Sequence, residues 1–219
     1  MSPVTASPQD TLVHSYLFLR RAIGVIGLAL PVVLIIGELF VDGGDLLNSL
    51  SGYYYSDMRD VFVGSMCAIG IFLLSYRGYG PIDDIAGNVA AVAAIGLALF
   101  PTTPGGPTRT DQIIGVLHLV FAAVFFLTLA FFCLSLFTKT DKAHPTQRKL
   151  QRNRIYVASG WIILLCLALI VLFGWLFDEA APLHPVLWLE SAATLAYGVA
   201  WLTKGEAILG DLSPGLPGR

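Results

Sequence analysis

Apolar residues fall into six long runs along the chain, and short polar segments separate these runs. Lipid offers no hydrogen-bond partner to a peptide group, so a chain that crosses a bilayer is helical, and about 20 mostly apolar residues span it. The pattern therefore predicts an all-α membrane protein, built as a bundle of six transmembrane helices. The expected spans are Ala22–Val41, Val61–Tyr76, Ile85–Phe100, Ile113–Phe137, Ile155–Phe177 and Val186–Leu202.

Polar segments at the two ends of the chain predict tails outside the membrane domain. Residues 1–19 and 205–219 contain Pro and Gly among polar residues, and we expect both tails to be poorly ordered and cytoplasmic. The six-helix transmembrane domain is expected over residues 20–204.

Composition strengthens the membrane interpretation. Of the 219 residues, 56% are hydrophobic and 13% are charged, and the mean hydropathy is +0.74, whereas soluble domains are about 25% charged. These values argue against a soluble enzyme, a nucleic-acid-binding protein and a disulfide-stabilised secreted domain. Cys67, Cys133 and Cys166 lie inside predicted spans without a CxxC pair, so we interpret them as packing residues.

Basic residues give the expected orientation, because cytoplasmic segments of membrane proteins carry an excess of Lys and Arg. With the N-terminus in the cytoplasm, eleven of the 13 Lys and Arg residues lie inside, and only Arg59 and Arg109 lie outside. We therefore expect a multi-pass membrane protein with both termini in the cytoplasm. Residues 138–154 form a strongly basic loop, which either only enforces this topology or also binds anionic headgroups or a cytoplasmic partner.

Small residues predict where the helices pack closely. In the third run, Ala90, Ala94 and Ala98 recur every four positions, which allows close approach of two backbones, and we expect this helix at the centre of the bundle. Gly24 and Gly27 predict a second close contact on the first helix. The fourth run carries six phenylalanines and is expected to be bulky and partly lipid-facing.

Four ionisable residues lie within the predicted spans or, for Asp60, at the outer start of one, where a charge is costly and marks a candidate functional site. They are Glu38, Asp60, His118 and Glu190. At a rise of about 1.5 Å per residue, each lies within roughly 5–8 Å of the outer end of its span. Four helices therefore place ionisable groups in one leaflet, which predicts an outward-facing polar pocket.

Aromatic residues mark the expected membrane boundaries. Tyr54 and Tyr55 belong to a run of three tyrosines in the loop between the first two spans, and they either form a belt at headgroup level or cover the predicted pocket. Trp188 is the expected outer anchor, and Trp201 with Lys204 the inner anchor. The candidate ligand-binding residues are Glu38, Tyr54, Tyr55, Asp60, His118 and Glu190.

The outer polar residues also suggest a catalytic alternative, in which Ser65, His118 and Asp60 act as nucleophile, base and orienting acid. A zinc site would need His118, His184 and a carboxylate, but the chain has no HExxH or HxxxH motif, so we expect neither a metal nor a cofactor. His184 lies between prolines and is expected in a turn.

Each candidate also has a purely structural interpretation, and the spacing of the residues does not decide between the two. Glu38 and Glu190 lie near span ends, where their carboxylates can reach water. Asp60 can pair with Arg59 and cap the second helix, where a negative charge is favourable. His118 can form a hydrogen bond with a neighbouring helix.

Three blocks of the sequence resemble a family of uncharacterised bacterial integral-membrane proteins. They are SGYYYSDMRDVFVGSMCAIGIFLLSYRGY, AGNVAAVAAIGLALFPT and WLESAATLAYGVAWLTKGE. The resemblance covers most of the chain between Arg20 and Glu206, and it implies a six-helix inner-membrane protein without a defined reaction. More remotely, a serine, an aspartate and histidines on helices resemble the CREST-type membrane hydrolases. That pattern has three zinc-binding histidines, whereas this chain offers only His118 and His184 on the outer side, so no catalytic role is carried over.

These features favour a protein that binds a lipid headgroup or a small polar ligand in an outward-facing pocket, with membrane lipids as partners. The main alternative is a membrane-embedded lipid hydrolase with His118 as its base. A proton- or ion-coupled transporter is less favoured, because such proteins have broken helices and repeats at the bilayer midplane. The fourth possibility is a structural subunit of a homo- or hetero-oligomer.

Overall fold

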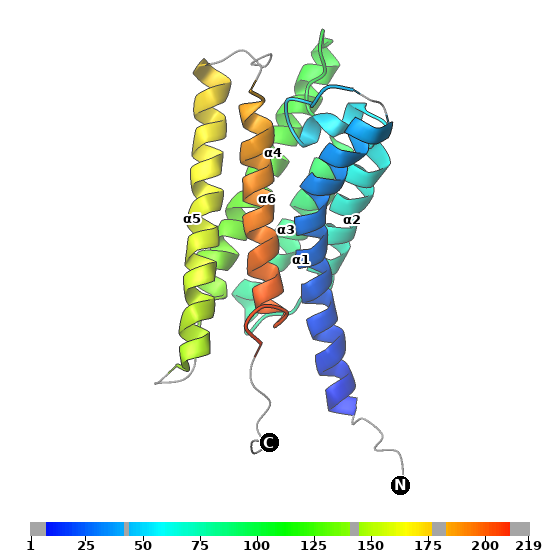
Figure 1. Cartoon of the computed structure of the whole chain (residues 1–219). Coiled ribbons are helices and arrows are strands. Elements are labelled where there is room, and N and C mark those ends of the chain that lie inside the picture. Colours follow the sequence, from blue (N-terminus) through cyan, green and yellow to red (C-terminus); the bar gives the residue numbers. More distant parts are fainter. Residues whose placement is uncertain (1–7, 42–43, 141–144, 177–182, 211–219) are drawn as a thin grey trace.

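Six α-helices and two short helical segments make up the described part of the chain (Figure 1). The structure is a computed structural model that describes residues 8–41, 44–140, 145–176 and 183–210. No strand occurs in these residues, so the all-α prediction is confirmed. The elements are α1 (Pro8–Val41), the 3-10 helix η1 (Ser51–Tyr55), α2 (Arg59–Ser75), α3 (Pro81–Leu99), α4 (Arg109–Phe131), the π-helix η2 (Phe132–Leu136), α5 (Gln147–Leu176) and α6 (Pro185–Lys204).

In the described ranges, five helices are long and apolar enough to cross a membrane, which indicates a membrane protein. The helix outside this group is α2, with 17 residues. Five of the six apolar runs fall on one helix each, and the fourth covers α4 and η2. The first helix, α1, begins at Pro8 rather than at Ala22, so much of the expected N-terminal tail is helical. The other parts of the expected tails, residues 1–7 and 211–219, lie outside the described residues.

Local sequence signals explain where several helices begin. Pro81 and Pro185 stand in the first turns of α3 and α6, where a missing N–H costs nothing. Thr108 caps α4: its hydroxyl accepts the Asp111 amide at 3.2 Å, and the Asp111 carboxylate accepts the Thr108 amide at 2.9 Å. This reciprocal pair satisfies amides that the helix itself leaves free.

The helices lie side by side and alternate in direction, so successive connections lie at opposite ends of the bundle (Figure 1). We call the end that carries η1 and the start of α6 the η1 end. The end where α1 begins and α6 finishes is called the Lys204 end. Along the bundle, α6 packs between α1 and α5, and α3 packs between α2 and α4.

In its most apolar stretch of 18 residues, the small-residue helix α3 is buried to a larger share than any other of the five apolar helices. Ala90, Ala94 and Ala98 are fully buried, as the four-residue spacing predicts. The fourth apolar run was predicted to be bulky and partly lipid-facing, and α4 meets this prediction in part. Much of the helix is exposed to the surroundings, whereas Phe125 and the later Phe132 are buried in the core rather than turned outward.

Glycines bring α1 and α6 into close contact, as predicted for Gly24 and Gly27. A Cβ atom on Gly24 would lie 2.7 Å from the backbone nitrogen of Leu202, and one on Gly27 would lie 3.2 Å from the Cα of Gly198. On the opposite helix, a Cβ on Gly198 would lie 2.8 Å from the nitrogen of Leu28. The two backbones therefore meet closely at points where at least one of them carries a glycine.

The predicted inner anchor is corrected by the structure. Trp201 is 0% exposed and Lys204 is 8% exposed, so neither lies on the outer surface of the bundle as a boundary anchor does. The Trp201 ring packs against Tyr76, Phe132 and Phe137 at centroid distances of 5.2, 5.7 and 5.2 Å. These rings come from the segments after α2 and α4, which draw the tryptophan into the core.

Candidate functional site

The short helix η1 is held in place at the η1 end by contacts from several elements. It packs on α2, and the Tyr55 hydroxyl donates to the carbonyl of Thr102, in the segment after α3, at 2.7 Å. A five-residue 3-10 helix has weak internal hydrogen bonding, so these outside contacts fix its position. The polar residues predicted from sequence are distributed around it.

Glu190 of α6 caps the start of η1. Its Oε2 atom accepts the backbone amide of Leu50 at 2.7 Å and that of Ser51 at 3.3 Å. Amides at the start of a helix have no partner within the helix, and a carboxylate there forms charge-assisted hydrogen bonds. Glu190 therefore pairs with protein amides, which differs from the interpretation in which it only reaches water.

Glu38 of α1 and Tyr53 of η1 form a buried polar pair without complete hydrogen bonding. Glu38 is 3% exposed and Tyr53 is 0% exposed. Neither Glu38 Oε2 nor the Tyr53 hydroxyl has a hydrogen-bond partner among the described residues. Burial raises the pKa of the Tyr53 phenol, and the nearby Glu38 carboxylate raises this pKa further, so Tyr53 keeps its proton. Buried polar atoms in proteins almost always have a partner, which makes this pair an exception that needs explaining.

A small cavity lies inside the bundle, next to Glu190 and Ser51. Its volume is about 30 Å³, with walls that are mostly apolar and come from α1, α2, α3, α4 and α6. Ser51, Glu190, Thr194 and Tyr197 supply its polar lining, and the buried Tyr197 hydroxyl has no partner in the part of the chain that the structure describes. The cavity has room for roughly one or two water molecules, so a larger ligand requires the lining to move.

His118 of α4 is bonded to the end of α3. The side chain is 2% exposed, and its Nδ1 atom lies 2.7 Å from the carbonyl oxygen of Phe100. Because a carbonyl oxygen only accepts, Nδ1 carries the proton in this hydrogen bond. The histidine thus satisfies one of the carbonyls left free where α3 ends. This is a hydrogen bond with a neighbouring helix, the structural alternative to a functional role for His118.

Within the described residues, His118 is not hydrogen-bonded or ion-paired to the candidates on α2 and η1, which are Asp60, Ser65, Tyr54 and Tyr55. Asp60 is exposed in the first turn of α2, and Ser65 is partly exposed. Within the described residues, no hydrogen bond or ion pair links either of them to His118 or to a glutamate. The geometry therefore gives no support to the Ser65–His118 catalytic alternative.

Arg59 contacts Tyr54 rather than Asp60, which was the pairing partner considered from the sequence. Its guanidinium donates to the Tyr54 hydroxyl at 2.9 Å and stacks over the Tyr54 ring at 4.4 Å. It forms no ion pair with Asp60 among the residues described. His184, as expected, lies in a turn: it has a left-handed φ of 45°, and its Nδ1 lies 2.8 Å from Asn48 Oδ1.

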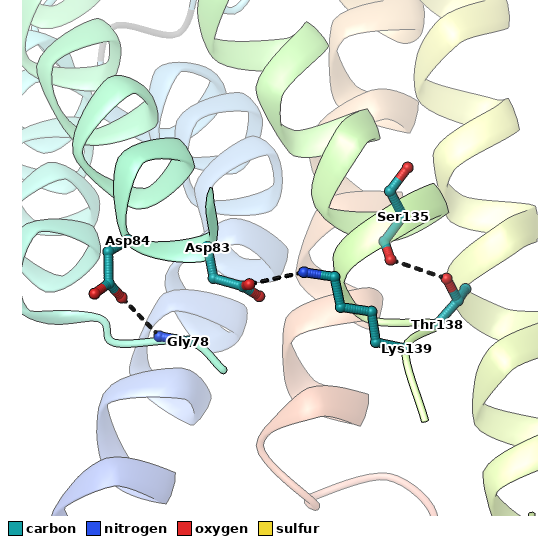
Figure 2. A network of polar contacts seen from close by, with 6 residues as sticks. All are labelled: Gly78, Asp83, Asp84, Ser135, Thr138 and Lys139. Atoms are coloured by element: carbon teal, nitrogen blue, oxygen red, sulfur yellow. Dashed lines mark hydrogen bonds and ion pairs between the residues drawn. The ribbon is translucent and has the colours of Figure 1, made fainter. Parts of the chain in front are cut away.

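A second polar region at the Lys204 end was not predicted as a site. Asp83, at the start of α3, is 1% exposed and pairs with Lys139 at 2.8 Å (Figure 2). Next to it, Asp84 accepts the amide of Gly78 at 3.0 Å. A Cβ on Gly78 would lie 1.9 Å from the Asp83 Cβ, so a glycine is required for this close approach. In the sequence, the two acidic residues in the polar start of α3 are the feature that could have indicated this polar region.

No group of three His, Cys, Asp or Glu side chains in the described ranges is arranged to hold a metal ion. The polar groups at the two ends of the bundle instead suit hydrogen bonding and charge pairing. At the η1 end they are mainly carboxylates and hydroxyls, whereas at the Lys204 end they are mainly cations and N–H or O–H donors.

Comparisons of this chain with protein-family models, with curated proteins and with solved structures found no match.

Proposed function

We propose that this chain is a six-span protein of the bacterial inner membrane that binds a small polar ligand, or the headgroup of a lipid, at its η1 end. The five long apolar helices support a membrane location. At about 1.5 Å per residue, α2 adds a sixth helix of roughly 25 Å, close to the hydrocarbon thickness of a bilayer. The excess of basic residues at the opposite end supports an outward-facing η1 end.

The observation that carries the proposal is the buried Oε2 atom of Glu38, which has no hydrogen-bond partner among the described residues, on a side chain that is 3% exposed. A carboxylate that is buried away from water is stabilised only by hydrogen-bond donors or a positive charge. Tyr53 lies close enough to affect it electrostatically, and its hydroxyl also has no partner among the described residues. A ligand with an ammonium group and a hydroxyl or ether oxygen would satisfy both side chains.

Glu190 gives this site a means of opening. Its carboxylate holds the start of η1 through the amides of Leu50 and Ser51, and the same side chain lines the cavity of about 30 Å³. Ligand entry displaces η1, since the cavity itself holds roughly one or two water molecules. The site in this proposal consists of Glu38, Tyr53 and Glu190, with Tyr54 and Tyr55 on the covering helix.

Ligand binding is tested by native mass spectrometry of the full-length protein in a mild detergent, with ethanolamine or with phosphatidylethanolamine added. Retention of the lipid alone identifies a headgroup site, and retention of free ethanolamine identifies a site for small amines. Glu38→Gln keeps the size of the side chain but removes its charge, and we expect binding to weaken about tenfold or more.

Asp60→Asn is the matched control, because it also neutralises one carboxylate at the η1 end but on an exposed side chain. It should retain the wild-type affinity. The proposal is wrong if neither compound binds the wild-type protein, or if Glu38→Gln and Asp60→Asn bind equally well.

A further inference from the structure

A separate cluster of hydrogen-bond donors lies inside the Lys204 end of the bundle. Lys204 and Trp201 stand three residues apart, and therefore on one face, at the end of α6. Tyr76 follows α2, and Arg20 comes from the first half of α1. We call these four residues, Arg20, Tyr76, Trp201 and Lys204, the donor cluster.

Ring contacts connect the four residues. The Arg20 guanidinium carbon lies 5.6 Å from the centre of the Tyr76 ring, and the Tyr76 ring lies 5.2 Å from that of Trp201. Trp201 packs on Phe137 at 5.2 Å, and the Lys204 ammonium lies 5.2 Å from the Phe137 ring. The donor cluster is thus one continuous region built from three parts of the sequence.

Three of these residues have buried donor atoms without a partner in the described part of the chain. These atoms are Arg20 Nε, the Tyr76 hydroxyl and Trp201 Nε1. Tyr76 is 2% exposed and Trp201 is 0% exposed. Since few buried polar atoms in proteins lack a partner, three in one region point to an acceptor that is not part of these residues.

Lys204 adds a charge to the same region. It is 8% exposed, and no ion pair or hydrogen bond joins its ammonium to any residue that the structure describes. The rings of Tyr79 and Phe137 face it at 4.8 and 5.2 Å. Such rings attract a cation, but they do not replace the acceptors that an ammonium with three N–H groups needs.

The charges around Lys204 do not supply the missing acceptor. Arg20, Lys149 and Arg152 are near enough to repel its ammonium, and the Asp83 carboxylate attracts it. Asp83 already pairs with Lys139 at 2.8 Å (Figure 2), although its Oδ1 atom has no partner among the described residues. Positive charge therefore exceeds negative charge around the cluster.

We propose that the donor cluster binds a phosphate group, with Lys204 and Arg20 providing charge and Trp201 and Tyr76 donating hydrogen bonds. Phosphate offers several strong acceptor oxygens and a negative charge, which matches four neighbouring donor side chains and an excess of cations. Basic pockets between helices at a membrane surface bind lipid phosphates in this way, and a free phosphate ion offers the same chemistry. This site is independent of the one proposed at the η1 end.

Phosphorus NMR of the full-length protein in dodecyl maltoside, which contains no phosphorus, measures binding directly. Inorganic phosphate alone and phosphatidylglycerol alone are titrated in separate experiments, with phosphatidylcholine as the comparison of zero net charge. Binding of phosphatidylglycerol in preference to phosphatidylcholine assigns the site to an anionic lipid, and binding of inorganic phosphate assigns it to the free ion. The absence of binding by both anions overturns the proposal.

Variants locate the site. Lys204→Met removes the buried charge without leaving a cavity, and Trp201→Phe keeps an aromatic ring while removing the Nε1 donor. We expect each to weaken binding about tenfold or more. Arg154→Met is the matched control, because Arg154 is an exposed cation on α5 that takes no part in the described contacts of the donor cluster. The proposal is overturned if Lys204→Met and Trp201→Phe bind like the wild type, or if Arg154→Met loses as much affinity as they do.

Discussion

Glu190 joins segments of the chain that lie 140 residues apart, because its carboxylate accepts the amide of Leu50. The neighbouring Ser51 amide donates to the same oxygen atom. Both amides stand at the start of η1, where no intrahelical acceptor is available. At the scale of single residues, this carboxylate therefore fixes the position of the helix that covers the proposed ligand site.

Replacing Glu190 tests this role. Glu190→Ala leaves two amides without their acceptor, and we expect it to lower the free energy of unfolding by about 2 kcal/mol. Glu190→Gln keeps one acceptor oxygen and should cost less than half of that loss. Unfolding in detergent mixtures measures both. Equal stability of Glu190→Ala and the wild type would show that these hydrogen bonds do not hold η1.

Replacing Tyr53 is expected to change stability in the opposite direction from Glu190→Ala. Its hydroxyl is buried and has no partner among the described residues, so Tyr53→Phe removes an unsatisfied group while keeping the ring. We expect the ligand-free protein to unfold at the same free energy or up to about 1 kcal/mol higher. Affinity for ethanolamine should fall at the same time. A clear loss of stability in thermal unfolding without ligand would mean that the hydroxyl has a partner.

Single residues were the hardest feature to predict from the sequence. Glu38 and Glu190 were singled out by their depth in apolar runs, which sequence alone reveals; the structure buries Glu38 and pairs Glu190 with the start of η1. The pairing of Glu190 with η1 depends on contacts between distant segments, so no local pattern indicates it. Trp201 and Lys204 resemble a boundary anchor in sequence, but the rings of Tyr76 and Phe137 draw them inward.

At the scale of helices, close backbone approach determines how α1 and α6 pack. Gly24 faces the Leu202 backbone nitrogen, and Gly198 faces that of Leu28. In a membrane no hydrophobic driving force brings helices together, so dispersion contacts at such small residues supply much of the association energy. Here the sequence was informative, because glycine and alanine spacing along a helix specifies the packing face directly.

Gly24→Ala tests this contact. The added Cβ would lie 2.7 Å from a backbone atom of α6, and a backbone cannot rotate away as a side chain can. We expect a loss of about 1–3 kcal/mol in the free energy of unfolding.

Gly64→Ala is the control for this prediction. Nothing lies within 4 Å of a Cβ at Gly64, and alanine is the better helix former, so stability should rise by up to about 1 kcal/mol. Both variants are compared in the same detergent unfolding experiment. A neutral Gly24→Ala variant would contradict the close contact between α1 and α6.

At the scale of the whole molecule, alternating helices place η1 at one end and the donor cluster at the other (Figure 1). The order and approximate bounds of the helices were predictable, since they follow from apolar runs of a fixed length. The early start of α1 at Pro8 was not, because the residues before Ala22 are more polar than a span requires.

Orientation is tested by single cysteines at the two ends. Asp57→Cys lies near η1 and Gln147→Cys at the start of α5, both on exposed positions. In intact cells, a membrane-impermeant maleimide should label Asp57→Cys, and it should reach Gln147→Cys only after the membrane is permeabilised. The wild-type protein provides the background from the three native cysteines. The reverse labelling pattern would place η1 in the cytoplasm.

The most direct test of the ligand site proposed at the η1 end is a crystal structure of the protein grown in a lipid mesophase that contains phosphatidylethanolamine. We expect density for an amine or hydroxyl group within about 3 Å of Glu38 Oε2, with η1 displaced or closed over it. A Glu38 carboxylate bonded only to protein groups or to water, with no ligand density beside it, would contradict the proposed site.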